Sequence, residues 1–272
     1  MESIEKLFDS RIIEKVMSLR LMDDDLMTKV FSDDLKTTEF ILRILMQKDD
    51  LRVIESHGKN ELHNIFGRSI KLDVLAEDSN HNLFNVEIQR ADKGAEPKRS
   101  RYHAAMLDSH FLEKGRHFNE LKPTYIIFIT ENDIWKKDLP VYEIEKLIKG
   151  TDLHFEDDLH ILYVNGAYRG DDPLGTLMHD FSCSNPDEMK YEELAQKVRY
   201  YKQETEGVKT MCKAFEELSQ VIGAEMVAER NIEVAETLLK QNLLPVDKIA
   251  EASGLTVEEI EEIARKLKAT SN

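Results

Sequence analysis

Two neighbouring stretches of the chain, residues 70–76 and 84–88, alternate apolar and polar side chains. The segment between them is polar and rich in turn formers. A period of two is typical of half-buried strands, so the pattern predicts an antiparallel hairpin that turns at Asn80. Successive strand residues point to opposite sides, which gives this hairpin one apolar face. Its three predicted cross-strand pairs are Leu72–Ile88, Val74–Val86 and Ala76–Phe84.

The other face of the predicted hairpin is polar. There Asp73 lies across from Glu87, with Gln89 two residues further along the same strand. Opposed Cβ atoms on paired strands are about 4.5–5.5 Å apart, a distance at which two like charges repel. A divalent cation between the carboxylates removes the repulsion, and Mg²⁺ is typically held by one or two carboxylates plus water. The alternative is a half-exposed sheet with a polar outer face, since 33% of the chain is charged.

The periodicity of the remaining residues predicts a central mixed sheet flanked by helices, an α/β fold. Helices are expected at residues 1–24, 25–31, 35–47, 98–114 and 174–181, with a short one at 141–148. Further strands are expected at residues 51–66, with a turn at 58–60, and at 125–129 and 159–164. The apolar run 125–129 predicts a fully buried strand.

The pattern changes near residue 186, where strand-like runs stop. We therefore expect a domain at residues 1–185 and a helical extension at 186–272 that ends in a helix-turn-helix-like hairpin. The second helix of that hairpin opens with four glutamates, which repel phosphates. A dimerisation or partner surface, or a plain stabilising hairpin, fits this element better than DNA reading, and helices within 190–241 could form a homodimer.

Composition restricts the possible classes. The chain has 272 residues, is 41% hydrophobic, and contains no apolar run of the roughly 20 residues that cross a bilayer. The N-terminal residues do not resemble a signal peptide, and the two cysteines form no CxxC pair. We therefore expect a cytoplasmic protein without a membrane segment, a disulfide framework or a cysteine-based zinc site.

The net charge of −16 argues against non-specific coating of nucleic acid. One local stretch is nevertheless basic, directly after the second hairpin strand: Arg90, Lys93, Lys98, Arg99, Arg101 and His103. This stretch is either a phosphate-binding surface or a solvated loop and helix face. Dinucleotide, P-loop, serine hydrolase and histidine-zinc signatures are absent from the sequence.

Several ordered motifs point to a known family. They are Leu72-Asp73, the strand end Asn85-Val86-Glu87-Ile88-Gln89, the helix start Arg101-Tyr102-His103, Gly115 with Phe118 and Leu121, and the box at residues 25–31. Over residues 20–180 the chain resembles the PD-(D/E)XK nuclease family transposases, also called recombination-promoting nucleases. Leu72 stands where the superfamily usually has proline. Gln89 replaces the usual lysine, as is common in this branch.

The resemblance implies a restriction-endonuclease-like core and a catalytic set of Asp73, Glu87, Gln89 and Arg101. Asp73, Glu87 and the Ile88 backbone carbonyl would bind Mg²⁺ or Mn²⁺, and Gln89 would orient the attacking water. Glu39 would either join the metal site, as a first-helix glutamate sometimes does, or be a solvated helix residue. DNA would be bound by Arg90, Lys98, Arg99 and Arg101.

Two functional hypotheses follow. The first is a metal-dependent DNA endonuclease linked to recombination or a mobile element, which the Asp73–Glu87 pair favours. The second is a non-catalytic module that keeps the nuclease fold and binds protein partners through its acidic helical tail. Gln89 and the net charge of −16 favour the second.

Overall fold

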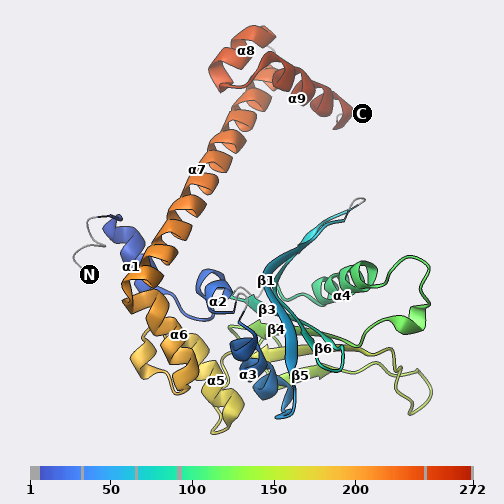
Figure 1. Ribbon diagram of the computed structural model, residues 1–272. Helices are drawn as coiled ribbons and strands as arrows, with labels where there is room; N and C mark the ends of the chain where they lie inside the picture. The colour runs from blue at the N-terminus through green and yellow to red at the C-terminus, as the bar shows by residue number, and fades with distance from the viewer. Residues whose placement is uncertain (1–6, 32–33, 65–66, 91–93, 242–243, 271–272) are drawn as a thin grey trace. The chain divides into compact units, whose positions relative to one another are not determined.

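The chain forms two compact units, residues 1–211 and 212–272. The computed structural model (Figure 1) describes residues 7–31, 34–64, 67–90, 94–241 and 244–270, without the side chains of 218–229 and 268–270. Each unit has its own core of buried apolar side chains.

The first unit is built on a six-stranded mixed sheet. Its strands are β1 (Val53–Leu62), β2 (Ile70–Asp78), β3 (Leu83–Gln89), β4 (Thr124–Thr130), β5 (Val141–Ile144) and β6 (Leu159–Asn165). They lie in the order β1-β2-β3-β4-β6-β5. β4 runs parallel to both of its neighbours, whereas the other pairs are antiparallel. The apolar run at 125–129 is therefore a buried central strand, as its composition predicts.

Helices cover both faces of this sheet, which confirms the α/β, restriction-endonuclease-like architecture. The helices of the first unit are α1 (Ser10–Ser18), α2 (Asp24–Phe31), α3 (Leu35–Met46), α4 (Pro97–Phe111), α5 (Pro173–Ser182) and α6 (Glu192–Gln203), with short 3-10 turns η1 (Phe118–Glu120) and η2 (Pro186–Glu188). Side chains of α2, α3 and α5 pack on the face that carries Val74, Val86 and Ile88. Leu107 of α4 packs with Leu75, Ile126 and Phe128 on the other face. Figure 1 shows α3 and α4 on opposite sides of the strands.

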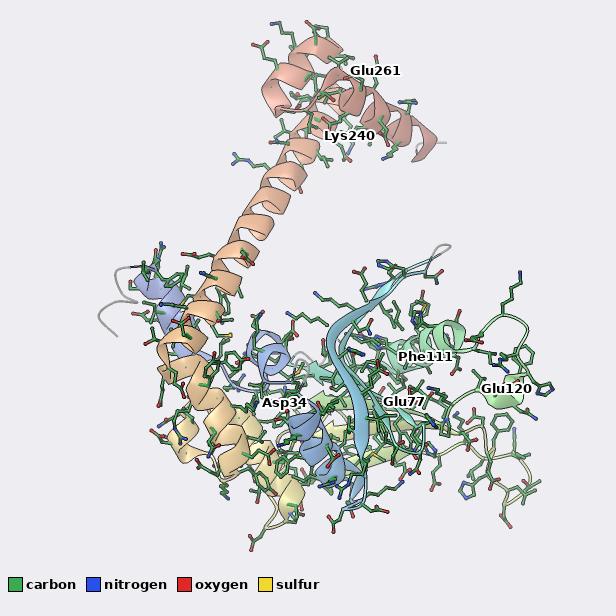
Figure 2. The ribbon with its side chains drawn as sticks, in the orientation of Figure 1. Asp34, Glu77, Phe111, Glu120, Lys240 and Glu261 are labelled. Carbon is green, nitrogen blue, oxygen red and sulfur yellow. The ribbon has the colours of Figure 1, made fainter. Side chains whose placement is uncertain are left out.

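Lys122 joins the end of α4 to the hairpin. Its Nζ atom lies 2.6 Å from a carboxylate oxygen of Glu77 on β2 and 5.5 Å from the centre of the Phe111 ring on α4. Figure 2 labels both of these partners. The contact holds α4 over the polar face of the β2–β3 hairpin.

The register of this hairpin agrees with two of the three predicted cross-strand pairs, whereas Leu72 and Ile88 are not paired. Val74 pairs with Val86, Leu75 with Asn85, and Ala76 with Phe84. The predicted apolar face is buried, with Val74 and Val86 at 1% and 5% exposure. The paired ladder ends at Val74–Val86, so β2 and β3 separate at Asp73 and Glu87.

Two local predictions are wrong. The turn expected at residues 58–60 is instead continuous strand β1, in which Gly58 pairs with Val74 and Asn60 with Leu72 while Lys59 takes a positive φ of 48°. The short helix expected at 141–148 is replaced by strand β5. There the Val141–Ile144 backbone pairs with β6, and that pairing outweighs the helical preference of the following charged residues.

The first unit extends past the boundary expected at 185, because α6 is anchored in it. Buried Lys202 donates through Nζ to the carbonyl oxygens of Leu19, at 2.8 Å, and Ser184. The Tyr201 hydroxyl donates to the Lys29 carbonyl at 3.0 Å. Residues 186–211 therefore belong to the first compact unit.

The second unit contains most of α7 (Thr205–Gln241), with α8 (Val246–Ser253) and α9 (Val257–Thr270). Its small core consists of Ala235, Ile249, Ala250 and Ile260. Gly254 ends α8 with a φ of 72°, a conformation that glycine adopts readily, and α9 follows this turn. Within the described residues, no helix has the length and apolar character needed to cross a membrane.

Candidate metal centre and nucleic-acid interface

The Asp73 and Glu87 carboxylates lie where β2 and β3 separate. The Asp73 backbone N–H donates to Glu87 Oε1 at 3.2 Å, and the Ile88 N–H donates to Asp73 Oδ2 at 2.9 Å. Each carboxylate thus accepts a backbone hydrogen from the other strand at the position where the ladder would have continued. The predicted juxtaposition of the two acidic residues is present in the structure.

The β3 part of this polar face is buried, whereas Asp73 on β2 is half-buried and Lys71 is exposed. Glu87 and Asn85 are both fully buried beneath α4. Asn85 Nδ2 donates to Glu87 Oε1 at 2.8 Å, and Asn85 Oδ1 lies 3.0 Å from His103 Nδ1. Buried polar groups in such a network fix one another's orientation. The alternation places Asn85 on this face, but no sequence signal identifies it as the residue that orients Glu87.

His103 supplies a neutral imidazole to this network and does not act as a phosphate-binding cation. Burial, with smaller contributions from the charges of Arg99 and Arg68, lowers the pKa of His103 to about 4. With Nδ1–H donating to Asn85, the Nε2 atom accepts from Arg99 Nε at 3.3 Å. The inclusion of His103 in a basic patch is therefore a wrong prediction, because the side chain is only 2% exposed.

Arg99 contacts the acidic site directly. Its guanidinium donates to Glu87 Oε2 at 3.0 Å and to Gln89 Oε1 at 3.1 Å, and it also donates to the Gly94 carbonyl. Sequence reasoning placed Arg99 among phosphate contacts, whereas its donors here bind the residues of the candidate metal centre. Arg99 therefore supplies positive charge beside a carboxylate that is fully buried.

Burial raises the pKa of both carboxyl groups. For Glu87 the second cause is the charge of Asp73, and the Asn85 hydrogen bond and the charge of Arg99 oppose it. For Asp73, the nearby charge of Asp24 also raises the pKa, while the Ile88 hydrogen bond and Lys59 lower it. The pair therefore retains a proton at a pH where ordinary carboxylates are ionised. A divalent cation bound by both carboxylates would displace that proton.

A basic cleft of about 840 Å³ opens beside this network. Its lining includes Arg68, Lys71, Lys98, Arg99, Arg101 and Tyr102, and Glu96 is the acidic residue among them. Lys98 and Arg101 are exposed on the first turns of α4. Although the chain is acidic overall, it thus concentrates positive charge next to the carboxylates. A phosphate backbone requires such positive charge for binding.

Three other predicted residues lie elsewhere or outside the described chain. Arg90 forms ion pairs with Asp23 at 2.6 Å and Glu131 at 3.4 Å, which explains its position without a nucleic acid. Lys93 lies outside the described residues. The third residue, Glu39, lies away from the carboxylate pair.

Glu39 is engaged at the opposite end of β2. It forms ion pairs with Arg43 and Arg52, and its Oε2 accepts the Val53 N–H at 3.0 Å. Val53 pairs with Asp78, five residues along β2 from Asp73, or about 16 Å at the rise of a strand. The structure contradicts the assignment of Glu39 as a metal ligand and identifies it as an ion-paired helix residue.

The fold and site together define a nuclease-like class of protein, with a hairpin-borne carboxylate pair beside a basic cleft. The chain belongs to the PD-(D/E)XK nuclease family transposases, whose family model matches residues 27–166, more than half of the sequence. That range contains the carboxylate pair, Gln89 and the helix α4. Neither a search of curated proteins nor a search of solved structures found a match. Membership supports a nuclease- or transposase-like function; PD-(D/E)XK nucleases typically use divalent metals, and the family implies DNA binding.

Proposed function

We propose that the protein is a metal-dependent DNA endonuclease that hydrolyses phosphodiester bonds. The observation that carries this proposal is the mutual arrangement of Asp73 and Glu87 where β2 and β3 separate, beside a basic cleft. The family match makes a role in recombination or a mobile element the corresponding biological proposal.

The donor set fits a hard divalent cation. Asp73 and Glu87 offer carboxylate oxygens, the ligands that Mg²⁺ and Mn²⁺ prefer. The Ile88 carbonyl is the third proposed ligand. Its N–H faces β2, and the N–H and C=O of a strand residue point to the same edge. A bound cation would polarise a phosphoryl oxygen and acidify water.

The remaining side chains take separate roles in this proposal. Gln89 orients the attacking water through its amide, and Arg99 holds both Gln89 and Glu87 in position. Arg101 and Lys98 bind phosphate oxygens from the exposed side of α4. Arg101 thereby stabilises negative charge on the phosphate in the transition state.

The alternative is a non-catalytic module that binds protein partners through its helical tail. Its support is the chain's net charge of −16 together with exposed glutamates 258, 261 and 262 on α9. Glu259 is occupied locally, because its carboxylate accepts from the Thr256 N–H at 2.8 Å. Dimerisation through residues 190–241 likewise stays a proposal, and light scattering during size-exclusion chromatography measures it.

Plasmid relaxation with the full chain in Mg²⁺ or Mn²⁺ tests the proposed chemistry. Glu87→Gln should lower the nicking rate at least about 100-fold, because a metal ligand is worth several kcal/mol in the transition state. Glu39→Gln is the matched control and should nick like the native chain. Absence of metal-dependent nicking by the native chain, or equal nicking by Glu87→Gln, would support the binding module instead.

A further inference from the structure

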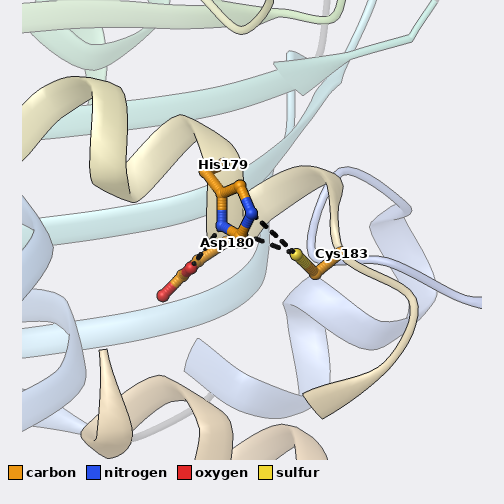
Figure 3. A group of neighbouring side chains, drawn as sticks. All are labelled: His179, Asp180 and Cys183. Atoms are coloured by element: carbon orange, nitrogen blue, oxygen red, sulfur yellow. Dashed lines mark hydrogen bonds and ion pairs between the residues drawn. The ribbon is translucent and has the colours of Figure 1, made fainter. Parts of the chain in front are cut away.

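A second cluster of metal-ligating side chains lies at the end of α5, outside the residues that match the family model. Figure 3 shows its members, His179, Asp180 and Cys183. His179 Nδ1 lies 3.0 Å from Asp180 Oδ1 and 3.7 Å from Cys183 Sγ. One ligand atom from each residue lies within 4.8 Å of the other two. His179 and Cys183 are four residues apart, so the last helical turn brings them to one side.

The carboxylate of this cluster is held in place from behind. Asp180 is fully buried, and its two oxygens accept the backbone N–H groups of Lys190 at 2.8 Å and Tyr191 at 2.7 Å. An ionised carboxylate has about four lone-pair sites, so these two bonds leave room for a cation. Hydrogen bonds of this kind commonly orient the ligands of protein metal sites.

We propose that His179, Asp180 and Cys183 bind one Zn²⁺ ion. Tetrahedral zinc with usual bond lengths separates a nitrogen from an oxygen or sulfur ligand by about 3.4–3.6 Å. The two distances from His179 bracket those values, so small side-chain rotations complete the set. A thiolate and an imidazole select zinc over magnesium, whereas the Asp73–Glu87 site offers oxygen donors. The chain would then hold two metal sites of different preference.

Zinc binding at this cluster would be coupled to proton release. Burial raises the pKa of the Cys183 thiol, and the charges of Asp180 and Glu188 act in the same direction. Without the ion the sulfur therefore carries its proton. Coordination breaks the S–H bond, forms the Zn–S bond and releases one proton to solvent.

The ion would stabilise the end of α5 beside the segment that leads into α6. Asp180 already joins the end of α5 to the backbone that leads into α6. Zinc would hold His179 and Cys183 against Asp180, so it fixes the last turn of α5 next to that backbone. The ion can enter from solvent, since the His179 side chain is 32% exposed. Three protein ligands leave the fourth position for water.

Titration of the full metal-free chain with Co²⁺ tests this site, because cobalt replaces zinc and a thiolate ligand produces charge-transfer absorption. The native chain should show that absorption and lose it when Zn²⁺ is added. Cys183→Ser and His179→Gln should abolish it and raise the Kd for Zn²⁺ about 100-fold or more. Cys212→Ser is the matched control, because Cys212 is the chain's other cysteine and lies on α7.

Two results separate this site from the proposed nuclease centre. Glu87→Gln should leave the cobalt spectrum unchanged, whether or not the protein cleaves DNA. The zinc proposal is overturned if the native chain gives no thiolate–cobalt absorption, or if Cys183→Ser gives the same spectrum as the native chain.

Discussion

The two faces of the β2–β3 hairpin differ in what fills them. On one face Val74, Val86 and Ile88 pack against apolar side chains of three helices. On the other, Asn85 and Glu87 are equally buried but lie in a hydrogen-bonded network under α4. Burial of the first face stabilises the fold, whereas burial of charge on the second opposes it. Folding stability therefore does not account for the residues of the polar face, whereas the proposed metal chemistry does.

The largest expected stability effect comes from Arg99→Ala on the polar face. Its removal leaves buried Glu87 without its cationic partner, which should cost about 2–3 kcal/mol of unfolding free energy after allowance for the partial exposure of Arg99. Urea unfolding measures this loss. Arg101→Ala, two residues further along α4 and exposed, is the control and should change stability by less than about 0.5 kcal/mol. Equal effects of both changes would contradict the structural role of Arg99.

Val86→Ala probes the apolar face and should destabilise by about 2 kcal/mol, because it leaves a cavity among well-packed side chains. The same unfolding experiment with and without Mg²⁺ makes the comparison between faces. The metal-dependent increase in stability should persist in Val86→Ala and disappear in Glu87→Gln. If both variants lose it, the two faces do not act separately.

Asp73→Asn should make the metal-free protein more stable at alkaline pH. The folded pair has raised pKa values, so the folded state binds more protons than the unfolded chain and loses stability as the pH rises through this range. Removing one charge should gain about 1 kcal/mol at pH 8, or about 2–4 °C in Tm, and nearly nothing at pH 4. Thermal unfolding at the two pH values checks the sign. A gain that is larger at pH 4 would contradict it.

The smallest effect concerns the basic cleft. Lys98→Ala and Arg101→Ala should each remove about one phosphate contact. Each change should therefore reduce the slope of log K for DNA binding against log salt concentration by about 0.9. Fluorescence anisotropy with a DNA duplex at several salt concentrations measures the slope. Arg90→Ala should leave it unchanged, because Arg90 is held by Asp23 and Glu131.

The hairpin and its acidic pair follow from the sequence because a period of two fixes both register and face. The partners of Glu87 do not follow from it. The rotation of α4 about its own axis decides that Arg99 contacts Glu87 and His103 contacts Asn85 while Arg101 stays exposed, and only packing sets that rotation. The assignment of Glu39 as a metal ligand is wrong for a similar reason. The helix pattern predicts the buried stripe beside Glu39, but it does not show which end of β2 Glu39 lies near. Strand β5 is held by its pairing with β6, which local sequence does not encode.

The early end of the β2–β3 ladder has a consequence for amide hydrogen exchange. The N–H groups of Asp73 and Ile88 have carboxylate acceptors instead of ladder carbonyls. Any ligand that draws those carboxylates away removes the acceptors of two specific amides and leaves the rest of the sheet paired. Exchange at these two positions therefore becomes a built-in reporter of site occupancy, readable by NMR without a substrate.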